Sequence, residues 1–317
     1  MRLLSKFLFI IPASFLLLVG PYFSFINFKN TEKNILYIEK GDSITASLNQ
    51  IISLNYFNKS LLKFYISSNN IKNIKAGEYF VKNKNIYEII NDISNGNFYK
   101  RSFTIREGSN IYDLKTNLSK SFLKNDCEML SCINSYKIKE GLLLPDTYFY
   151  YRDTKSSEII LSSNRSLNSL MDKLWINKPD SNPLKNKYEA LILASIIEKE
   201  AGNNDEKYLI SGVFLNRLNK KMRLQADPTI IYGLLPNFDG DIKKTDILNK
   251  RNIYNTYMNN GLPPSPIAFA SKSSIEAAIL AEPNEYLFFV ADSASSHYFS
   301  KSYKEHKEAI NRLGLDK

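Results

Sequence analysis

Apolar residues dominate the start of the chain. Residues 7–28 read FLFIIPASFLLLVGPYFSFINF and carry no charge, and Arg2 and Lys6 precede them. An apolar helix of about 20 residues spans the hydrocarbon core of a bilayer. A cleaved signal peptide is the alternative, but no small-x-small cleavage site follows the run. We therefore expect residues 1–28 to form a cytoplasmic tip and a single-pass transmembrane anchor in the inner (plasma) membrane, with the rest of the chain exported.

A small α/β module follows the anchor. Residues 29–33 are polar and are expected to form a short linker. Alternating apolar positions, glycine turns and capping residues then predict a compact unit over residues 34–100. Its expected elements are a strand at 35–38, a helix capped by Asp42 or Ser43, a helix near 60–68, a strand after Gly77, and a helix at 86–95.

The hydrophobic pattern of residues 101–317 predicts a second unit that is mainly helical, with a few strands. The expected helices are at 156–175, 187–201, 205–220, 272–281 and from about 301, with a short helix within 223–240. A strand broken by Pro145 is expected within 140–150, and a buried strand at 286–292. The proline-rich stretch 252–268 is expected to be a loop. The whole pattern indicates an α+β fold.

Composition and charge add little to this picture. The chain is 44% apolar and 23% charged, which is typical of a folded protein, and its formal net charge is +10. No run of five basic residues occurs, so we do not expect a nucleic-acid partner. A mildly basic surface also suits anionic lipid headgroups and anionic wall polymers.

The few cysteines and histidines do not indicate a metal site. Cys127 and Cys132 are the two cysteines, and His297 and His306 are the two histidines. Their spacing matches no zinc-binding pattern, so no metal is expected. If the domain is extracytoplasmic, Cys127 and Cys132 could pair, and the sequence leaves this open.

The segment LILASIIEKEAG (191–202) is the strongest candidate for chemistry. It predicts an apolar helix that ends in Glu198, Lys199 and Glu200. Glu198 continues the face of Leu191 and the other buried positions, whereas Glu200 lies roughly 200° further round and should face elsewhere. Burial and the negative end of the helix dipole both disfavour a carboxylate, so Glu198 is expected to keep its proton, as a general acid must. The alternative is a structural glutamate paired with a lysine or arginine.

Two further clusters combine polar groups with turn residues. In MRLQADPTIIYGL (222–234), Asp227 and Pro228 suit a helix start, with Asp227 as the N-cap, but capping does not explain Gln225. The stretch YNTYMNNGLPPSPI (254–267) predicts a stiff loop with aromatic and amide groups, which suit sugar binding. An ordinary proline-rich surface loop is the alternative.

Six stretches in a fixed order carry a resemblance to a known family. They are EGLLLPDTYFY (140–150), LASIIEKEAG (193–202), VFLNRL (213–218), MRLQADPTIIYGL (222–234), YNTYMNNGLPPSPI (254–267) and YLFFVAD with HYF (286–299). Together they resemble the YceG-like family of endolytic murein transglycosylases. YIEKGDSI, IKAGEYFV and FTIREGSNI resemble the LysM-like module of that family and its junction. The resemblance thus covers essentially the whole chain.

The resemblance implies a lytic transglycosylase that needs no cofactor and acts on peptidoglycan glycan strands. It implies Glu198, the first glutamate of ASIIEKE, as the single acid/base. It also implies residues that hold substrate or shape the cleft: Gln225, Asp227, Tyr254, Asn255 and Tyr257, and more weakly Glu140 and Asp146. Cell wall synthases of the elongation machinery are partners by resemblance only.

Two rival functions remain open at this point. A non-catalytic, membrane-anchored protein would bind wall glycan through the LysM-like module, with Glu198 in a structural role. A soluble lyase that uses pyridoxal phosphate is the second rival, because the family has carried an aminodeoxychorismate lyase label. The predicted anchor argues against the second, and no convincing phosphate-cradling glycine loop occurs in the sequence.

Overall fold

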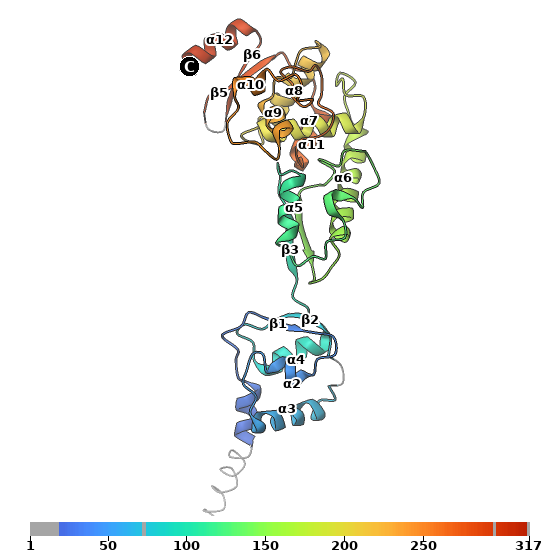
Figure 1. Ribbon diagram of the computed structural model, residues 1–317, viewed down its shortest axis with the longest axis vertical. Helices are drawn as coiled ribbons and strands as arrows, with labels where there is room; N and C mark the ends of the chain where they lie inside the picture. The colour runs from blue at the N-terminus through green and yellow to red at the C-terminus, as the bar shows by residue number, and fades with distance from the viewer. Residues whose placement is uncertain (1–18, 72–73, 294–295, 316–317) are drawn as a thin grey trace, which may run out of the picture. The chain divides into compact units, whose positions relative to one another are not determined.

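The computed structural model describes residues 19–71, 74–293 and 296–315 (Figure 1). The chain divides into two compact units: residues 1–101 with 149–153, and residues 102–148 with 154–317. The described chain combines helices with two-stranded sheets, so the fold is α+β, as the hydrophobic pattern predicts.

The predicted membrane anchor lies mostly outside the described residues. Residues 1–18 fall there, and residues 19–26 are helical. Among the described residues, no helix combines the length and the apolar character needed to cross a membrane. Phe25 and Ile26, near the end of the apolar run, are buried in the core of the first unit. The end of the predicted anchor therefore packs as part of a folded unit.

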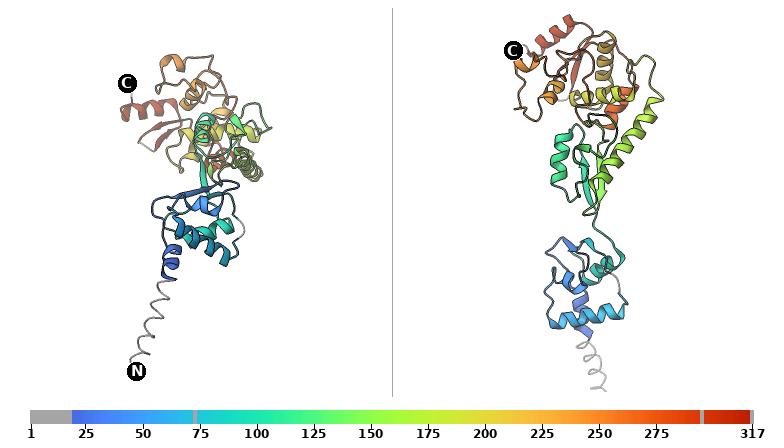
Figure 2. Two further views of the ribbon diagram at one scale, coloured as in Figure 1. Left: turned by 60° about the horizontal axis from the view of Figure 1, so that its bottom comes forward. Right: turned by 45° about the vertical axis from the view of Figure 1, so that its right-hand side comes forward.

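The first unit combines a two-stranded antiparallel sheet with helices. Ile35 of β1 lies opposite Phe80 of β2. Ser43 caps α2 by accepting a hydrogen bond from the Ala46 amide (3.1 Å), as one of the two predicted caps. The elements are β1 (Ile35–Ile38), α2 (Ile44–Leu48), α3 (Tyr56–Ser68), β2 (Gly77–Phe80) and α4 (Ile86–Asn95). The two strands lie on the opposite side of this unit from α3 (Figures 1 and 2).

The expected linker at 29–33 is wrong. Asn30 is buried, and its side-chain amide donates to the carbonyls of Val81 (3.0 Å) and Lys33 (2.7 Å). Lys29 forms an isolated β-bridge with Asn85. The polar composition of residues 29–33 predicted an exposed segment. The side chain of a buried asparagine, however, can form hydrogen bonds with backbone groups. Residues 29–33 are therefore an ordered part of the first unit.

An ion-pair cluster joins distant segments of the same unit. The buried Glu78 carboxylate binds Arg101 Nε at 2.6 Å and Arg152 Nη1 at 2.9 Å. Burial alone would raise the pKa of Glu78, but hydrogen bonds and charge from Arg101 and Arg152 lower it below its usual value. Arg152 also lies 4.4 Å from the centre of the Tyr37 ring. The segment 149–153 is thereby fixed to the first unit.

The second unit is built around α7 (Lys187–Glu200). Residues 190–197 of this helix are all buried, and α7 packs against α8, α9 and α11. The other elements of this part are β3 (Arg101–Ile105), α5 (Ile111–Ser119), the 3-10 helix Glu128–Leu130, β4 (Asp146–Tyr150), α6 (Ser156–Trp175), α8 (Lys207–Asn219), α9 (Asp227–Leu234), α10 (Lys244–Ile247), α11 (Lys272–Leu280), β5 (Phe288–Ala291), β6 (His297–Ser300) and α12 (Tyr303–Arg312). β3 pairs with β4, and β5 pairs antiparallel with β6.

Most of the predicted elements are confirmed to within a few residues. The strand expected at 286–292 is present as β5, but its predicted burial is wrong, because its residues are half-buried or exposed. The expected strand at 140–150 is too long, because β4 begins only at Asp146, after Pro145. The sequence pattern missed α10 and β6, which have four residues each. A disulfide joins Cys127 to Cys132, whose Cα atoms are 5.2 Å apart, which answers a question that the sequence left open.

Candidate active site

The end of α7 presents two glutamates in different directions. Glu198 points towards α8 and α11, where hydrogen bonds hold it. Glu200 points into a separate cavity. The exposed Lys199 lies between them. This divergence follows from the helical rotation of about 200° over two residues, as the sequence predicts.

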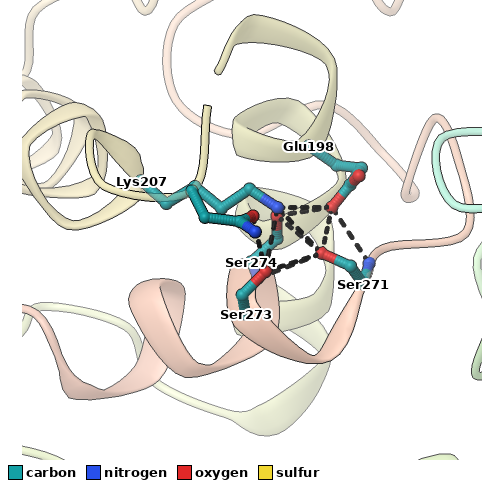
Figure 3. A network of polar contacts seen from close by, with 6 residues as sticks. Glu198, Lys207, Ser271, Ser273 and Ser274 are labelled. Atoms are coloured by element: carbon teal, nitrogen blue, oxygen red, sulfur yellow. Dashed lines mark hydrogen bonds and ion pairs between the residues drawn. The ribbon is translucent and has the colours of Figure 1, made fainter. Parts of the chain in front are cut away.

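Glu198 is bound tightly by the start of α11 (Figure 3). Its Oε2 atom accepts hydrogen bonds from the Ser271 amide (3.0 Å), the Ser271 hydroxyl and the Ser274 hydroxyl (2.5 Å). The Lys207 ammonium of α8 lies 3.3 Å from the same oxygen. Ser271 is the N-cap of α11. Glu198 thus joins α7 to two neighbouring helices.

The Lys207 ammonium completes this polar network. It also donates to the hydroxyls of Ser271 and Ser273, each at 2.9 Å. The side chains of Lys207 and Glu198 are only 6% and 9% exposed. Removing one member of a buried ion pair leaves an uncompensated charge, which is strongly destabilising. These contacts fit the structural alternative for Glu198 that the sequence left open.

Glu200 lines a cavity of about 440 Å³ in the second unit. Three of the residues expected to hold substrate line the same cavity: Gln225, Asp227 and Tyr257. Glu198 does not line it. The other lining residues are Arg217, Phe288, Phe289, Val290, Ala291, His297, Tyr303 and His306. The cavity is therefore formed by the end of α7, the segment before α9, the 252–268 loop, the β5–β6 hairpin and α12.

The surroundings of Glu200 favour its protonated form. Burial and, after it, the negative charge of Asp227 raise the pKa of Glu200 to about 8, against the opposing positive charge of Arg217. Glu200 still opens on the cavity, because part of its surface is accessible. A carboxylic acid that keeps its proton near neutral pH and faces a cavity can act as a general acid. Sequence reasoning expected this state for Glu198.

Arg217 of α8 holds the wall of the cavity together. Its guanidinium donates to the carbonyls of Leu287 (2.7 Å) and Leu224 (2.6 Å). It also lies 5.3 Å from the centre of the Phe288 ring. Burial lowers the pKa of Arg217, against the negative charge of Glu200. Arg217 thus fixes β5 beside the segment that carries Gln225 and supplies positive charge near Glu200.

Asp227 faces the cavity and does not cap α9. The helix begins at Asp227 itself, Ala226 is the N-cap, and no side chain caps the helix. The expected capping role of Asp227 is wrong, because its carboxylate accepts a hydrogen bond from the Tyr257 hydroxyl at 2.7 Å. Gln225 has a left-handed backbone, with φ of 50°. A non-glycine residue rarely adopts this conformation, and functional sites are where it concentrates.

Asn255 and Tyr254 shape the loop that carries Tyr257, but they do not line the cavity. The buried Asn255 amide donates to three backbone carbonyls of residues 246–249, and its oxygen accepts from the Tyr257 amide (2.9 Å). The Tyr254 hydroxyl lies 2.8 Å from the Ser265 hydroxyl. Both side chains therefore act on the site through the loop.

The remaining two candidates, Glu140 and Asp146, lie away from the cavity. The buried Glu140 accepts hydrogen bonds from the Ile111 and Gly141 amides and from the Tyr232 hydroxyl, each at 3.0 Å. Burial raises the pKa of Glu140 to about 7 in spite of these donors. Asp146 is exposed and binds only the amide of Thr147 (2.7 Å) among the contacts described. Glu140 is a structural link, and Asp146 starts β4.

Both histidines of the chain line the cavity, and sequence reasoning gave neither a role. Glu206, before α8, holds His297: its carboxylate lies 2.7 Å from Nδ1 and accepts from the His297 amide at 2.8 Å. Burial and the charge of Arg217 lower the pKa of His306. Within the described ranges, no group of three His, Cys, Asp or Glu side chains could hold a metal ion.

Comparison with known proteins agrees with the motif order. The model of the YceG-like family matches residues 36–312. The chain belongs to the YceG-like family. An endolytic murein transglycosylase of Bacillus subtilis is 32% identical over 304 residues, which cover 86% of this chain and 82% of that protein. One from Streptococcus pneumoniae is 31% identical over 175 residues, covering 54% of this chain and 31% of that protein.

A solved structure shares the fold. The crystal structure of a putative YceG-like protein from Listeria monocytogenes superposes with a TM-score of 0.56 at 31% sequence identity. The match covers 88% of this chain and 99% of that one. The same family thus accounts for both units of the fold.

Proposed function

We propose that this chain is an endolytic peptidoglycan lytic transglycosylase, which cuts nascent glycan strands between N-acetylmuramic acid and N-acetylglucosamine, leaves 1,6-anhydro ends, and so limits strand length. The names of the relatives support this activity. The observation that carries it in this molecule is the cavity in which Glu200 meets Gln225, Asp227 and Tyr257. These are the polar groups that a glycan-cleaving site requires.

The geometry favours Glu200 over Glu198 as the acid/base. Glu200 faces the cavity and keeps its proton near neutral pH, whereas the oxygen of Glu198 is occupied by Ser271, Ser274 and Lys207. The assignment of the acid/base role to Glu198 stays a prediction, which the glycan digest described below tests. Both glutamates lie in the same motif, so the choice between them does not change the family.

The proposed reaction uses one carboxyl group as both acid and base, a second carboxylate only to stabilise charge, and no water. Glu200 donates its proton to the glycosidic oxygen, and the bond from that oxygen to C1 of the muramoyl residue breaks. The Asp227 carboxylate, held by Tyr257, stabilises the positive charge that develops at C1. The C6 hydroxyl of the same muramoyl residue attacks C1, and its proton returns to Glu200. The products are a free 4-hydroxyl and a 1,6-anhydro end, so atoms and charge balance.

The site of action is proposed to be the outer face of the plasma membrane. The apolar run from residue 7 and the Cys127–Cys132 disulfide support an exported protein with a retained anchor, because disulfides persist in oxidising compartments. Two helices between the antiparallel strands β1 and β2 support the LysM-like assignment of residues 34–100. Synthases of the elongation machinery stay partners by resemblance only.

The deciding experiment is a digest of uncrosslinked glycan strands by the full chain in detergent. Wild type, Glu200→Gln and Glu198→Gln would be compared, with products read by mass spectrometry. We expect internal fragments with 1,6-anhydro ends from wild type, none from Glu200→Gln, and the same fragments from Glu198→Gln at a temperature where it is folded.

Other products would point elsewhere. Hydrated reducing ends would show a hydrolase, with Asp227 activating water. Full turnover by Glu200→Gln, together with an inactive but folded Glu198→Gln, would return the acid/base role to Glu198. Glycan retention without cleavage by any variant would favour the non-catalytic binding protein.

A further inference from the structure

The first unit displays an unusual number of exposed aromatic side chains at one end. Their exposed fractions run from 52% to 89%, and they come from the segment around residues 19–28 and from α3. We call this set the aromatic face: Phe23, Phe28, Tyr56, Phe57 and Phe64. Large apolar patches on a soluble surface mark a site of contact with a partner or a membrane.

On α3, the aromatic residues occupy the side that should be polar. Tyr56, Phe57 and Phe64 lie within about 60° of Ser60 around the helix, at 100° per residue. The opposite side of α3 buries Leu62 and Tyr65 in the core. The exposed side of α3 therefore carries three aromatic rings beside the polar Ser60 and Lys63, whereas an amphipathic helix normally exposes mainly polar residues.

The two parts of the aromatic face are joined. The Tyr22 ring meets the Phe64 ring edge to face, with centroids 5.7 Å apart. A cavity of about 510 Å³ lies in the same unit, lined by Phe25, Phe28 and Phe57 among others. The aromatic face thus forms one surface with a hollow in it.

The position of this surface along the chain indicates what covers it. Residues 7–18 are uncharged and mostly apolar, and residue 19 begins the described helical segment directly after them. Phe25 and Ile26 lock this segment into the core, and Asn30 binds Val81. A bilayer that holds residues 7–18 would then lie close to the first unit, because the described chain continues from residue 19 straight into that unit.

The charges around the aromatic face suit a negative surface. Lys29, Lys59 and Lys63 are exposed, and α3 contains no acidic residue. Lysines attract anionic lipid headgroups, and aromatic rings prefer the depth of the headgroups. A bilayer surface meets both requirements at once.

We propose that the aromatic face binds the surface of an anionic bilayer, so that α3 lies in the headgroup layer and the first unit is seated on the membrane. The proposal rests on the anchor that is part of the proposed function. It goes beyond that function, because a tethered enzyme does not require a seated module. Seating would fix how close to the bilayer this unit stands.

The test uses the full chain reconstituted in vesicles of phosphatidylcholine and phosphatidylglycerol that carry a nitroxide lipid. A fluorophore on Ser60→Cys reports the aromatic face, and one on Lys40→Cys, in the exposed turn after β1, is the matched control. Labelling without reductant keeps the Cys127–Cys132 disulfide intact. We expect at least about twofold quenching at position 60 and little at position 40, since the label would sit at headgroup depth.

Two further measurements test whether the aromatic face and the anionic lipid make the contact. Phe57→Ser with Phe64→Ser should lower the quenching at position 60, and so should vesicles without phosphatidylglycerol. Equal quenching at positions 60 and 40, or none at 60, overturns the proposal, as does crosslinking of Ser60→Cys between two copies in place of quenching. Alkaline extraction of the same vesicles tests the anchor separately. The quenching decides the seating whichever way the extraction turns out.

Discussion

Replacing Glu200 by Gln should abolish activity and stabilise the protein at the same time. The pKa of Glu200 is raised from 4.5 to about 8 in the folded chain. Between these two values, the unfolded chain releases a proton that the folded chain keeps, so the free energy of unfolding falls as pH rises through this window. Glutamine has no proton to lose, so the variant avoids this decline.

The size of the gain in stability follows from the pKa shift of Glu200. One pKa unit corresponds to about 1.4 kcal/mol, so the gain in unfolding free energy should be about 1 kcal/mol at pH 5 and about 3 kcal/mol at pH 7. It should level off above about pH 8, where the folded chain also ionises. The activity of wild type should fall tenfold for each unit above that pH, because the general acid must be protonated.

Urea unfolding at several pH values measures the stability. The fluorescence of Trp175 reports the second unit, since it is the only tryptophan and lies in α6. Glycan digestion at the same pH values measures the activity. If the gain in unfolding free energy does not grow between pH 5 and 7, Glu200 is not protonated in the folded chain. If Glu200→Gln cleaves glycan as fast as wild type, Glu200 is not the acid.

Four further changes test the rest of the second unit. Glu198→Gln should lower the unfolding free energy by about 3 kcal/mol by leaving Lys207 without its buried partner, and adding Lys207→Met should recover part of this loss in the same urea assay. Asp227→Asn should reduce glycan turnover by about a hundredfold with little change in stability, because it removes a charge from the cavity, and unchanged turnover would exclude Asp227 from charge stabilisation. Tyr257→Phe should act in the same direction but more weakly, about tenfold, since it removes only one donor to Asp227. Gly233→Ala should destabilise the second unit by about 2 kcal/mol in thermal unfolding, because a Cβ at this position would lie 1.9 Å from the side-chain oxygen of Asn252. A neutral effect would show that the loop that carries Asn252 moves freely.

The periodicity of the sequence predicted α6 and α7 well, because each is long and has clear ends. From the helical face it chose Glu198 as the acid/base, with Glu200 facing elsewhere. The argument from the helical face assumed that α7 has one buried side, but residues 190–197 are buried all round. In such a helix, burial alone does not identify the side that faces a site.

The cavity itself could not be predicted from local patterns. Its far wall is formed by β5, β6 and α12, which lie more than 80 residues after Glu200. Strand β6 has only four residues, and its period-two pattern is too short to recognise beside two serines. Asp227 was assigned to a helix cap because capping rules are local, whereas the Tyr257 hydroxyl that binds it comes from a loop 30 residues away.

The two glutamates of α7 make an activity assay alone ambiguous. Glu198 holds the end of α7 against α11 through Ser271, and this same helix end positions Glu200 in the cavity. A change at Glu198 can therefore reduce cleavage by displacing Glu200, without any contact between Glu198 and the substrate. The unfolding free energies separate the two cases, because loss of a buried ion-pair partner and loss of a desolvated acid have opposite signs. Cleavage by Glu200→Gln then decides the case: if that variant is inactive and more stable, Glu200 is the acid, and the loss of activity in a less stable Glu198→Gln is structural.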